Sequence, residues 1–100
     1  MKHLAKYSNT IKSLCDKHKV KSLYAFGSLL TDNFNDKSDI DLVVDFYPVD
    51  LKAYTDNYFA LKFSLEELFR RPVDLLEAGT IRNPYFKKSV IKNRQLVYGQ

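Results

Sequence analysis

The chain has 100 residues, of which 45% are hydrophobic, and a net charge of +4. This length predicts a single domain, residues 1–100, with a small core, and no apolar run approaches the roughly 20 residues that a membrane-spanning helix needs. The first residues lack the apolar segment of a secretory signal, and Cys15 is the only cysteine, which excludes an internal disulfide, so we expect a cytoplasmic protein without membrane contact.

The ends of the chain are basic and its centre is acidic. Residues 1–21 contain six lysines and one aspartate, residues 79–100 contain five basic residues and no acidic one, and residues 22–78 contain eleven acidic and five basic residues. The centre therefore suits a cation, and the ends suit a triphosphate, an acidic partner or a nucleic acid. Helices with lysine on their solvated faces explain the basic ends without any partner. We do not expect direct nucleic-acid binding, because no recognition motif accompanies the charge.

The N-terminal segment predicts an amphipathic helix over residues 3–18. Its apolar side chains recur three or four residues apart with lysines between them, at Leu4, Tyr7, Ile11, Leu14, Cys15 and His18. Cys15 and His18 share this stripe. We interpret them as a core residue and a boundary histidine rather than as a metal-binding or nucleophilic pair.

A first strand is predicted over residues 19–26, and Gly27 ends it. A glycine lets the backbone approach a ligand closely, and Ser28 offers a hydroxyl and an N–H group where the chain turns. A turn that opens a short helix presents free N–H groups to a phosphate. We therefore predict phosphate binding at Gly27 and Ser28, followed by a helical turn and a loop over residues 29–36.

Two aspartates open the second predicted strand, residues 39–46. Alternation puts Asp39 and Asp41 on one face and the apolar residues beside them on the other. Neighbouring carboxylates repel each other, and hard divalent cations favour such oxygen ligands, so the pair predicts a metal site. A solvated strand face that simply carries two charges is the alternative. We do not count Asp45 as a ligand, because we expect it to be out of phase with the pair.

The pair Gly27-Ser28, followed by Ser38-Asp39-Ile40-Asp41-Leu42-Val43, resembles the signature of the DNA polymerase beta nucleotidyltransferase superfamily. The small size is similar to that of its minimal nucleotidyltransferase (MNT) branch, of the MntA-like antitoxin type. One departure concerns residues 29–32, which read Leu-Leu-Thr-Asp where MNT-like proteins often have an arginine and then a glycine.

A long helix is predicted over residues 51–69. Pro48 ends the strand before it, and Asp50 is a suitable N-terminal cap. Leucine, tyrosine and phenylalanine then recur at helical spacing for five turns. Phe59 and Phe63 form a flanking stripe that belongs either to the core or, with Tyr47, to a partner surface.

A third strand is predicted over residues 73–76, and it carries Asp74 within an apolar run. A carboxylate there is unfavourable unless it faces a site, and a charge at the start of a strand is the alternative interpretation. The resemblance implies a site, because the family places a third metal-binding carboxylate on a later strand and Asp74 matches it.

Asn83 and Pro84 predict the start of a last helix, as its cap and its first residue. We expect Tyr85, Val90 and Ile91 on the inner face of this helix and its lysines on the outer face. A short closing strand or tail follows it.

Together, these patterns and the resemblance imply an α/β (α+β) nucleotidyltransferase fold, with a small mixed β-sheet flanked by helices. The resemblance implies that the catalytic residues and the ligands of two Mg²⁺ or Mn²⁺ ions are Asp39, Asp41 and Asp74. It implies that the residues that bind the nucleotide are Gly27, Ser28 and Ser38.

By the same resemblance, the reaction is transfer of AMP from ATP to a hydroxyl group, namely a tyrosine of a helical HEPN-type partner, and the chain is the antitoxin of a toxin–antitoxin pair. The alternative is a weak or inactive nucleotide-binding scaffold that neutralises its partner by covering it. The missing arginine favours the scaffold, and the three aspartates favour the enzyme. A domain of this size buries a limited share of its surface, so a homo-oligomer also remains open.

Overall fold

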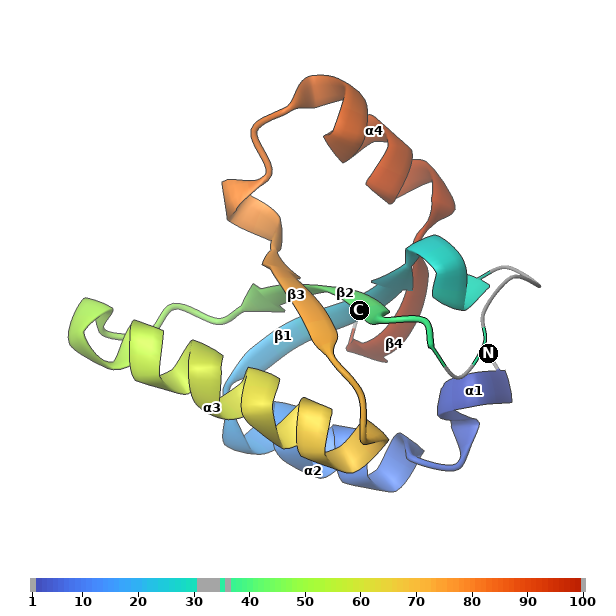
Figure 1. Cartoon of the computed structure of the whole chain (residues 1–100). Coiled ribbons are helices and arrows are strands. Elements are labelled where there is room, and N and C mark those ends of the chain that lie inside the picture. The colour runs from blue at the N-terminus through green and yellow to red at the C-terminus, as the bar shows by residue number, and fades with distance from the viewer. Residues whose placement is uncertain (1, 31–34, 36, 100) are drawn as a thin grey trace.

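The computed structural model of the chain describes residues 2–30, 35 and 37–99, which form a four-stranded sheet with helices on both faces (Figure 1). The strands are β1 (Val20–Phe26), β2 (Ile40–Phe46), β3 (Val73–Glu77) and β4 (Gln95–Gly99), in the order β3-β2-β1-β4. Strand β1 runs antiparallel to both β2 and β4, whereas β2 and β3 are parallel. The predicted α+β fold with a small mixed sheet is confirmed.

Two layers of helix enclose the sheet. Helices α2 (Ser8–Lys17) and α3 (Leu51–Phe69) cover one face, and α4 (Pro84–Asn93) lies on the other side (Figure 1). Helix α3 connects β2 to β3, and a crossover of this kind is what allows consecutive strands to run parallel. None of the described helices is both long and apolar enough to cross a membrane.

The main core lies between the sheet and helices α2 and α3. Most of its strand residues occupy alternate positions, as a period of two requires, and these are Leu23, Ala25, Ile40, Leu42, Val44, Val73 and Leu75. Val20 also belongs to the core but precedes a shift in the register of β1 with β2. The helices add Ile11, Cys15, Leu61 and Leu65. Val43 alternates to the opposite face of the sheet, where it is buried on the side of α4.

The single N-terminal helix predicted over residues 3–18 is wrong. The structure has a short helix α1 (Lys2–Ala5), and a turn that ends at Tyr7 separates it from α2. The Tyr7 N–H group donates to the Leu4 carbonyl at 3.0 Å, and the Tyr7 ring meets Phe69 of α3 edge-on, with 5.1 Å between ring centroids. The turn thus lets Tyr7 pack against a helix that is remote in the sequence, which the local periodicity does not reveal.

Helix α3 has the predicted extent, but its first turn differs from expectation. Leu61, Leu65 and Phe69 are buried, whereas Leu51 is 86% exposed because the first turn extends beyond the sheet (Figure 1). Asp50 occupies the position before the helix, yet its side chain makes no capping hydrogen bond. The prediction of Asp50 as a side-chain cap is therefore wrong.

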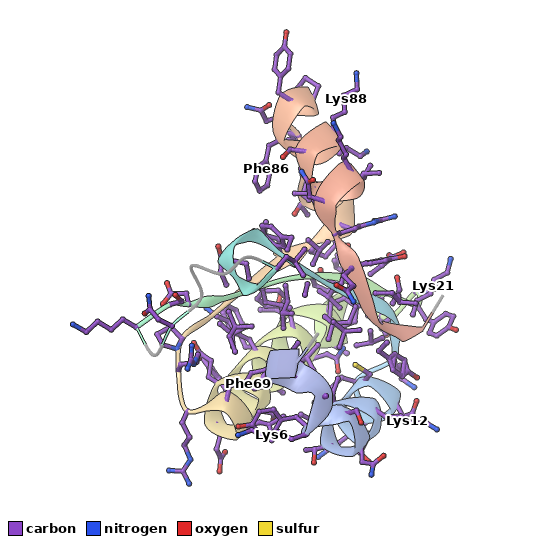
Figure 2. The ribbon with its side chains drawn as sticks, turned by 90° about the vertical axis from the view of Figure 1, so that its right-hand side faces the viewer. Lys6, Lys12, Lys21, Phe69, Phe86 and Lys88 are labelled. Carbon is purple, nitrogen blue, oxygen red and sulfur yellow. The ribbon has the colours of Figure 1, made fainter. Side chains whose placement is uncertain are left out.

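Helix α4 begins as predicted but buries less than expected. The Asn83 Oδ1 atom accepts hydrogen bonds from the N–H groups of Tyr85 at 2.9 Å and Phe86 at 3.1 Å. Val90 is buried, but Tyr85 is 85% exposed and Ile91 is 51% exposed, so their predicted inward orientation is wrong. Figure 2 shows the reason, since α4 rises away from the sheet, with Phe86 and Lys88 on opposite sides.

Candidate active site

Two of the predicted site residues lie side by side on parallel strands. Asp41 of β2 is in register with Asp74 of β3, and on its other side Asp41 pairs with Phe26 of β1. The neighbours of Asp41 in its own strand, Ile40 and Leu42, are buried in the main core on the opposite face. Alternation and the crossover through α3 together bring the two carboxylates to one face of the sheet.

The third carboxylate, Asp39, directly precedes β2, and its negative charge acts on Asp41 as the charge of Asp74 does. The pKa of Asp41 is raised above its ordinary value, first because burial penalises its charged form, then because of the charge of Asp74, and then because of the charge of Asp39. The three carboxylates therefore destabilise one another when all are ionised. A divalent cation at this position would relieve that cost.

The donor set suits a hard cation such as Mg²⁺, which takes carboxylate oxygens as ligands. Asp41 is half-buried, whereas Asp39 and Asp74 are exposed. Within the described ranges, no three His, Cys, Asp or Glu side chains are already arranged to hold a metal ion. Binding of a cation there would therefore require the exposed side chains of Asp39 and Asp74 to turn toward Asp41.

Asp45 does not fall out of phase with the pair, and that prediction is wrong. The pairing of β1 with β2 is regular from Ser22 opposite Asp45 to Phe26 opposite Asp41. Asp45 therefore shares the face of Asp41, but it lies further along β2, toward the opposite end of the strand. The phase argument against Asp45 as a ligand therefore fails, and what separates Asp45 from Asp41 is its position along the strand.

Gly27 lies against the carboxylate pair. It has a φ of +70°, a left-handed conformation that favours glycine, and it opens the short 3₁₀ helix η1 (Gly27–Leu30). A Cβ atom on Gly27 would lie 2.5 Å from Oδ2 of Asp41, closer than any real contact. The backbone of Ser28 belongs to η1, while the Ser28 side chain and residues 31–34 lie outside the described residues.

A cavity of about 540 Å³ opens beside this turn, between η1 and α4. It is lined by Phe26, Gly27, Leu30, Phe86, Ser89, Val90 and Asn93. The rings of Phe26 and Phe86 meet edge-on at 6.1 Å between centroids. The sequence did not indicate that residues of α4 line a cavity, because nothing local shows that α4 returns to η1.

Ser38 braces the loop that leads into β2. Its Oγ atom accepts a hydrogen bond from the Asn35 N–H at 3.1 Å, and its own N–H donates to the Asn35 carbonyl at 3.0 Å. Arg71 holds the same loop, because its Nη1 atom donates to the carbonyls of Asn35 and Ser38, at 3.0 Å each. The sequence did not single out Arg71, because this bracing role next to Asp39 depends on contacts with residues that are 33 or more positions away.

Cys15 and His18 lie in the core, away from the carboxylates. Burial, with the charge of Asp16, raises the pKa of the Cys15 thiol to about 12, so the thiol stays protonated. His18 Nδ1 lies 3.1 Å from Asn57 Oδ1, and Asn57 Nδ2 donates to the His18 carbonyl at 2.7 Å. These bonds tie α2 to α3.

Comparison with known proteins agrees with this geometry. A model of the nucleotidyltransferase domain matches residues 8–97. A protein of Methanocaldococcus jannaschii named "putative protein adenylyltransferase" is 43% identical over 89 residues, which is 87% of this chain and 84% of that protein.

Solved structures resemble the chain as well. One described as a "putative minimal nucleotidyltransferase" has a TM-score of 0.76 at 25% identity, covering 92% of this chain and 90% of the other. A toxin–antitoxin structure with AMP-PNP has a TM-score of 0.71 at 23% identity, covering 93% and 73%. A complex of a tri-AMPylated HEPN toxin with an MNT antitoxin from Shewanella oneidensis has a TM-score of 0.64 at 21% identity, covering 93% and 70%. The chain belongs to the nucleotidyltransferase domain family.

Proposed function

We propose that this protein transfers AMP from ATP to a tyrosine hydroxyl of a HEPN-type helical partner, as the antitoxin of a toxin–antitoxin pair. The observation that carries the proposal is the register of Asp41 with Asp74 next to the turn at Gly27. The name of the M. jannaschii relative supports protein adenylylation. The AMPylated HEPN toxin found with a structurally similar antitoxin supports the kind of partner.

The three carboxylates would hold two Mg²⁺ or Mn²⁺ ions. Asp39 and Asp41 would provide oxygen ligands for the ions, and Asp74 would provide a further one on the side of the acceptor hydroxyl. When bound, such a pair of ions lowers the pKa of the attacking hydroxyl and neutralises the leaving oxygen. The pKa of Asp41, raised first by burial and then by the charges of Asp74 and Asp39, supports this assignment, because a cation there would offset the charges of the neighbouring carboxylates.

The chain's own residues would then act in a single displacement. The acceptor oxygen forms a bond to the α-phosphorus of ATP, the bond from that phosphorus to the bridging oxygen breaks, and pyrophosphate leaves. Asp74 would receive the proton of the acceptor hydroxyl. Gly27 would admit the outer phosphates close to the backbone, and Ser28 would bind them. Ser38 would hold the loop before Asp39 in place through its hydrogen bonds to Asn35.

The cavity between η1 and α4 supports nucleotide binding at this end of the sheet. Its volume of about 540 Å³ falls within the range of small-molecule sites, and Gly27 lines it. The aromatic rings of Phe26 and Phe86 offer apolar walls. We place the reaction in the cytoplasm, where a single buried cysteine is compatible with reducing conditions.

The second candidate function is a nucleotide-binding scaffold that neutralises its partner by covering it. Leu29 and Leu30 favour this reading, because they are apolar at positions where related sequences often supply a cation to the triphosphate. A transition state that gathers charge on the phosphates would be less well stabilised without that cation. We therefore expect slow transfer.

The test is to incubate the protein with α-labelled ATP, Mg²⁺ and a HEPN-type helical protein. We expect covalent label on the partner's tyrosine, and we expect Asp74→Asn to abolish it while the complex still forms, because a carboxamide is a poor proton acceptor and a poor ligand for a hard cation. An intact complex with no label, under Mg²⁺ and Mn²⁺ alike, would reject the transferase in favour of the scaffold.

A further inference from the structure

We propose that helix α3 positions the Asp74 carboxylate through two side chains, Tyr58 and Glu66, which hold the β3 backbone on either side of it. The inference rests on the proposed function, because it concerns the same carboxylate site. It names two positioning residues that do not themselves face the site.

The two contacts bracket Asp74. Glu66 Oε2 accepts a hydrogen bond from the Val73 N–H at 3.0 Å, and the Tyr58 hydroxyl donates to the Leu75 carbonyl. Val73 and Leu75 are the residues immediately before and after Asp74, and both are buried in the main core. The backbone on both sides of the carboxylate is thus fastened to a single helix.

These contacts matter because β3 is an edge strand of the sheet, bonded to β2 along one side. Alternate residues of a strand direct their backbone groups to the same side, and the Pro72 carbonyl accepts from the Ile40 N–H of β2 at 3.1 Å. Val73 and Leu75 therefore direct theirs to the free edge, where a strand has no partner. Tyr58 and Glu66 take the place of the missing neighbouring strand there.

The hydroxyl of Tyr58 is suited to this role. Burial, and then the charge of Asp74, raise the pKa of Tyr58 above its ordinary value, so the phenol keeps its proton and remains a donor. The Tyr58 ring also meets Phe59 edge-on at 5.1 Å between centroids. Tyr58→Phe therefore removes the donor while it preserves the ring packing.

Position matters at such a site, because ligands of a metal act well only when they are held within about half an ångström of their working geometry. Side chains that hold the ligands, without touching the metal, commonly change metal affinity or activity by about tenfold or more when they are removed. A purely structural contact would instead lower the melting temperature and leave the metal affinity of the folded protein unchanged.

The test measures Mn²⁺ affinity by water proton relaxation on the folded protein, with the melting temperature recorded beside it. We expect Tyr58→Phe and Glu66→Ala each to weaken Mn²⁺ binding by about tenfold. Glu66→Gln should restore it, because the amide oxygen still accepts from the Val73 N–H. The matched control is Tyr54→Phe, since Tyr54 is half-buried on the same helix and no hydrogen bond of its hydroxyl is found among the described residues.

AMP transfer provides a second and separable readout. In the two impaired variants we expect a lower kcat with little change in the KM for ATP, because Asp74 serves the acceptor end of the reaction. If both variants bind Mn²⁺ more weakly than the wild type but the wild type itself transfers no AMP, the positioning role is supported and the transferase is rejected. Wild-type Mn²⁺ affinity in both variants, whatever their melting temperatures, would overturn the inference, as would a wild-type protein that binds no Mn²⁺.

Discussion

A Cβ atom placed on Gly27 would lie 2.5 Å from Oδ2 of Asp41, so the turn that ends β1 passes directly against the half-buried carboxylate of β2. Gly27 is therefore required for two reasons. Its backbone is left-handed, with a φ of +70°, and there is no room for a side chain beside Asp41. The same contact keeps the turn and the carboxylate pair together at one end of the sheet.

Gly27→Ala should weaken binding of Mg²⁺ and ATP strongly, because the new methyl group displaces the Asp41 carboxylate. We also expect a loss of about 1–3 kcal/mol in the free energy of unfolding from backbone strain. Titration with ATP and Mg²⁺, followed by urea denaturation, checks both effects. Gly79→Ala is the matched control, because Gly79 has no left-handed φ and its Cβ would meet only the flexible side chain of Glu77 at 3.2 Å. Unchanged ATP affinity in Gly27→Ala would place the nucleotide elsewhere.

Asp41 should make metal-free stability depend on pH. Its raised pKa means that the folded chain holds this proton to a higher pH than the unfolded chain does. The stability that the protonated carboxyl contributes is fully present below the pKa of the unfolded chain and is lost as pH rises through the folded pKa. We therefore expect Asp41→Asn to be as stable as the wild type in acid and more stable at neutral pH.

Urea denaturation of both proteins between about pH 3 and pH 7, a range that spans the ordinary titration of aspartate, measures this difference. Millimolar Mg²⁺ with ATP should raise the melting temperature of the wild type but not that of Asp41→Asn, because a ligand stabilises only the state that binds it. A large loss of metal-free stability in Asp41→Asn would identify Asp41 as a structural residue.

Arg71 should be important for activity although it lies outside the carboxylate set. One of its guanidinium nitrogens donates to the carbonyls of Asn35 and Ser38 in the loop before Asp39. Arg71→Lys substitutes a compact ammonium group for this planar fork, so we expect a loss of about 1 kcal/mol in stability and slower AMP transfer. Arg70→Lys, at the exposed helix end, is the control and should resemble the wild type within about 0.5 kcal/mol. Equal activity in both variants would contradict the role of Arg71.

The exposed aromatic pair on α3 should contribute to partner binding. Phe59 is 43% exposed and Phe63 is 58% exposed, and their rings stack with 5.8 Å between centroids. Phe63→Ser should therefore weaken the complex with the helical partner while the free energy of unfolding of the protein alone changes little. Calorimetric titration of the partner measures the effect, and Tyr85→Ser, which alters an 85% exposed ring on α4, is the control. If only Tyr85→Ser weakened binding, the partner surface would lie on α4.

The sequence by itself determined the elements whose signals are local. Strand β2 follows from alternation of apolar residues around Asp41, and α3 follows from a helical repeat over five turns. The start of α4 follows from Asn83, whose side chain bonds to backbone groups only two and three residues away. Each signal depends on near neighbours in the chain, so it can be read without knowing the fold. The Gly-Ser and Asp-x-Asp motifs likewise indicated the candidate site from short segments.

Only the tertiary structure decided which residues meet. The register of Asp41 with Asp74 depends on how the α3 crossover places β3, and the break before α2 depends on the contact of Tyr7 with Phe69. The exposure of Ile91 depends on how far α4 rises from the sheet (Figure 2). Tyr58 and Arg71 bond to backbone groups that are 17 and 33 residues away. Such contacts leave no periodic pattern, because they are set by the packing of whole elements rather than by the residues beside them.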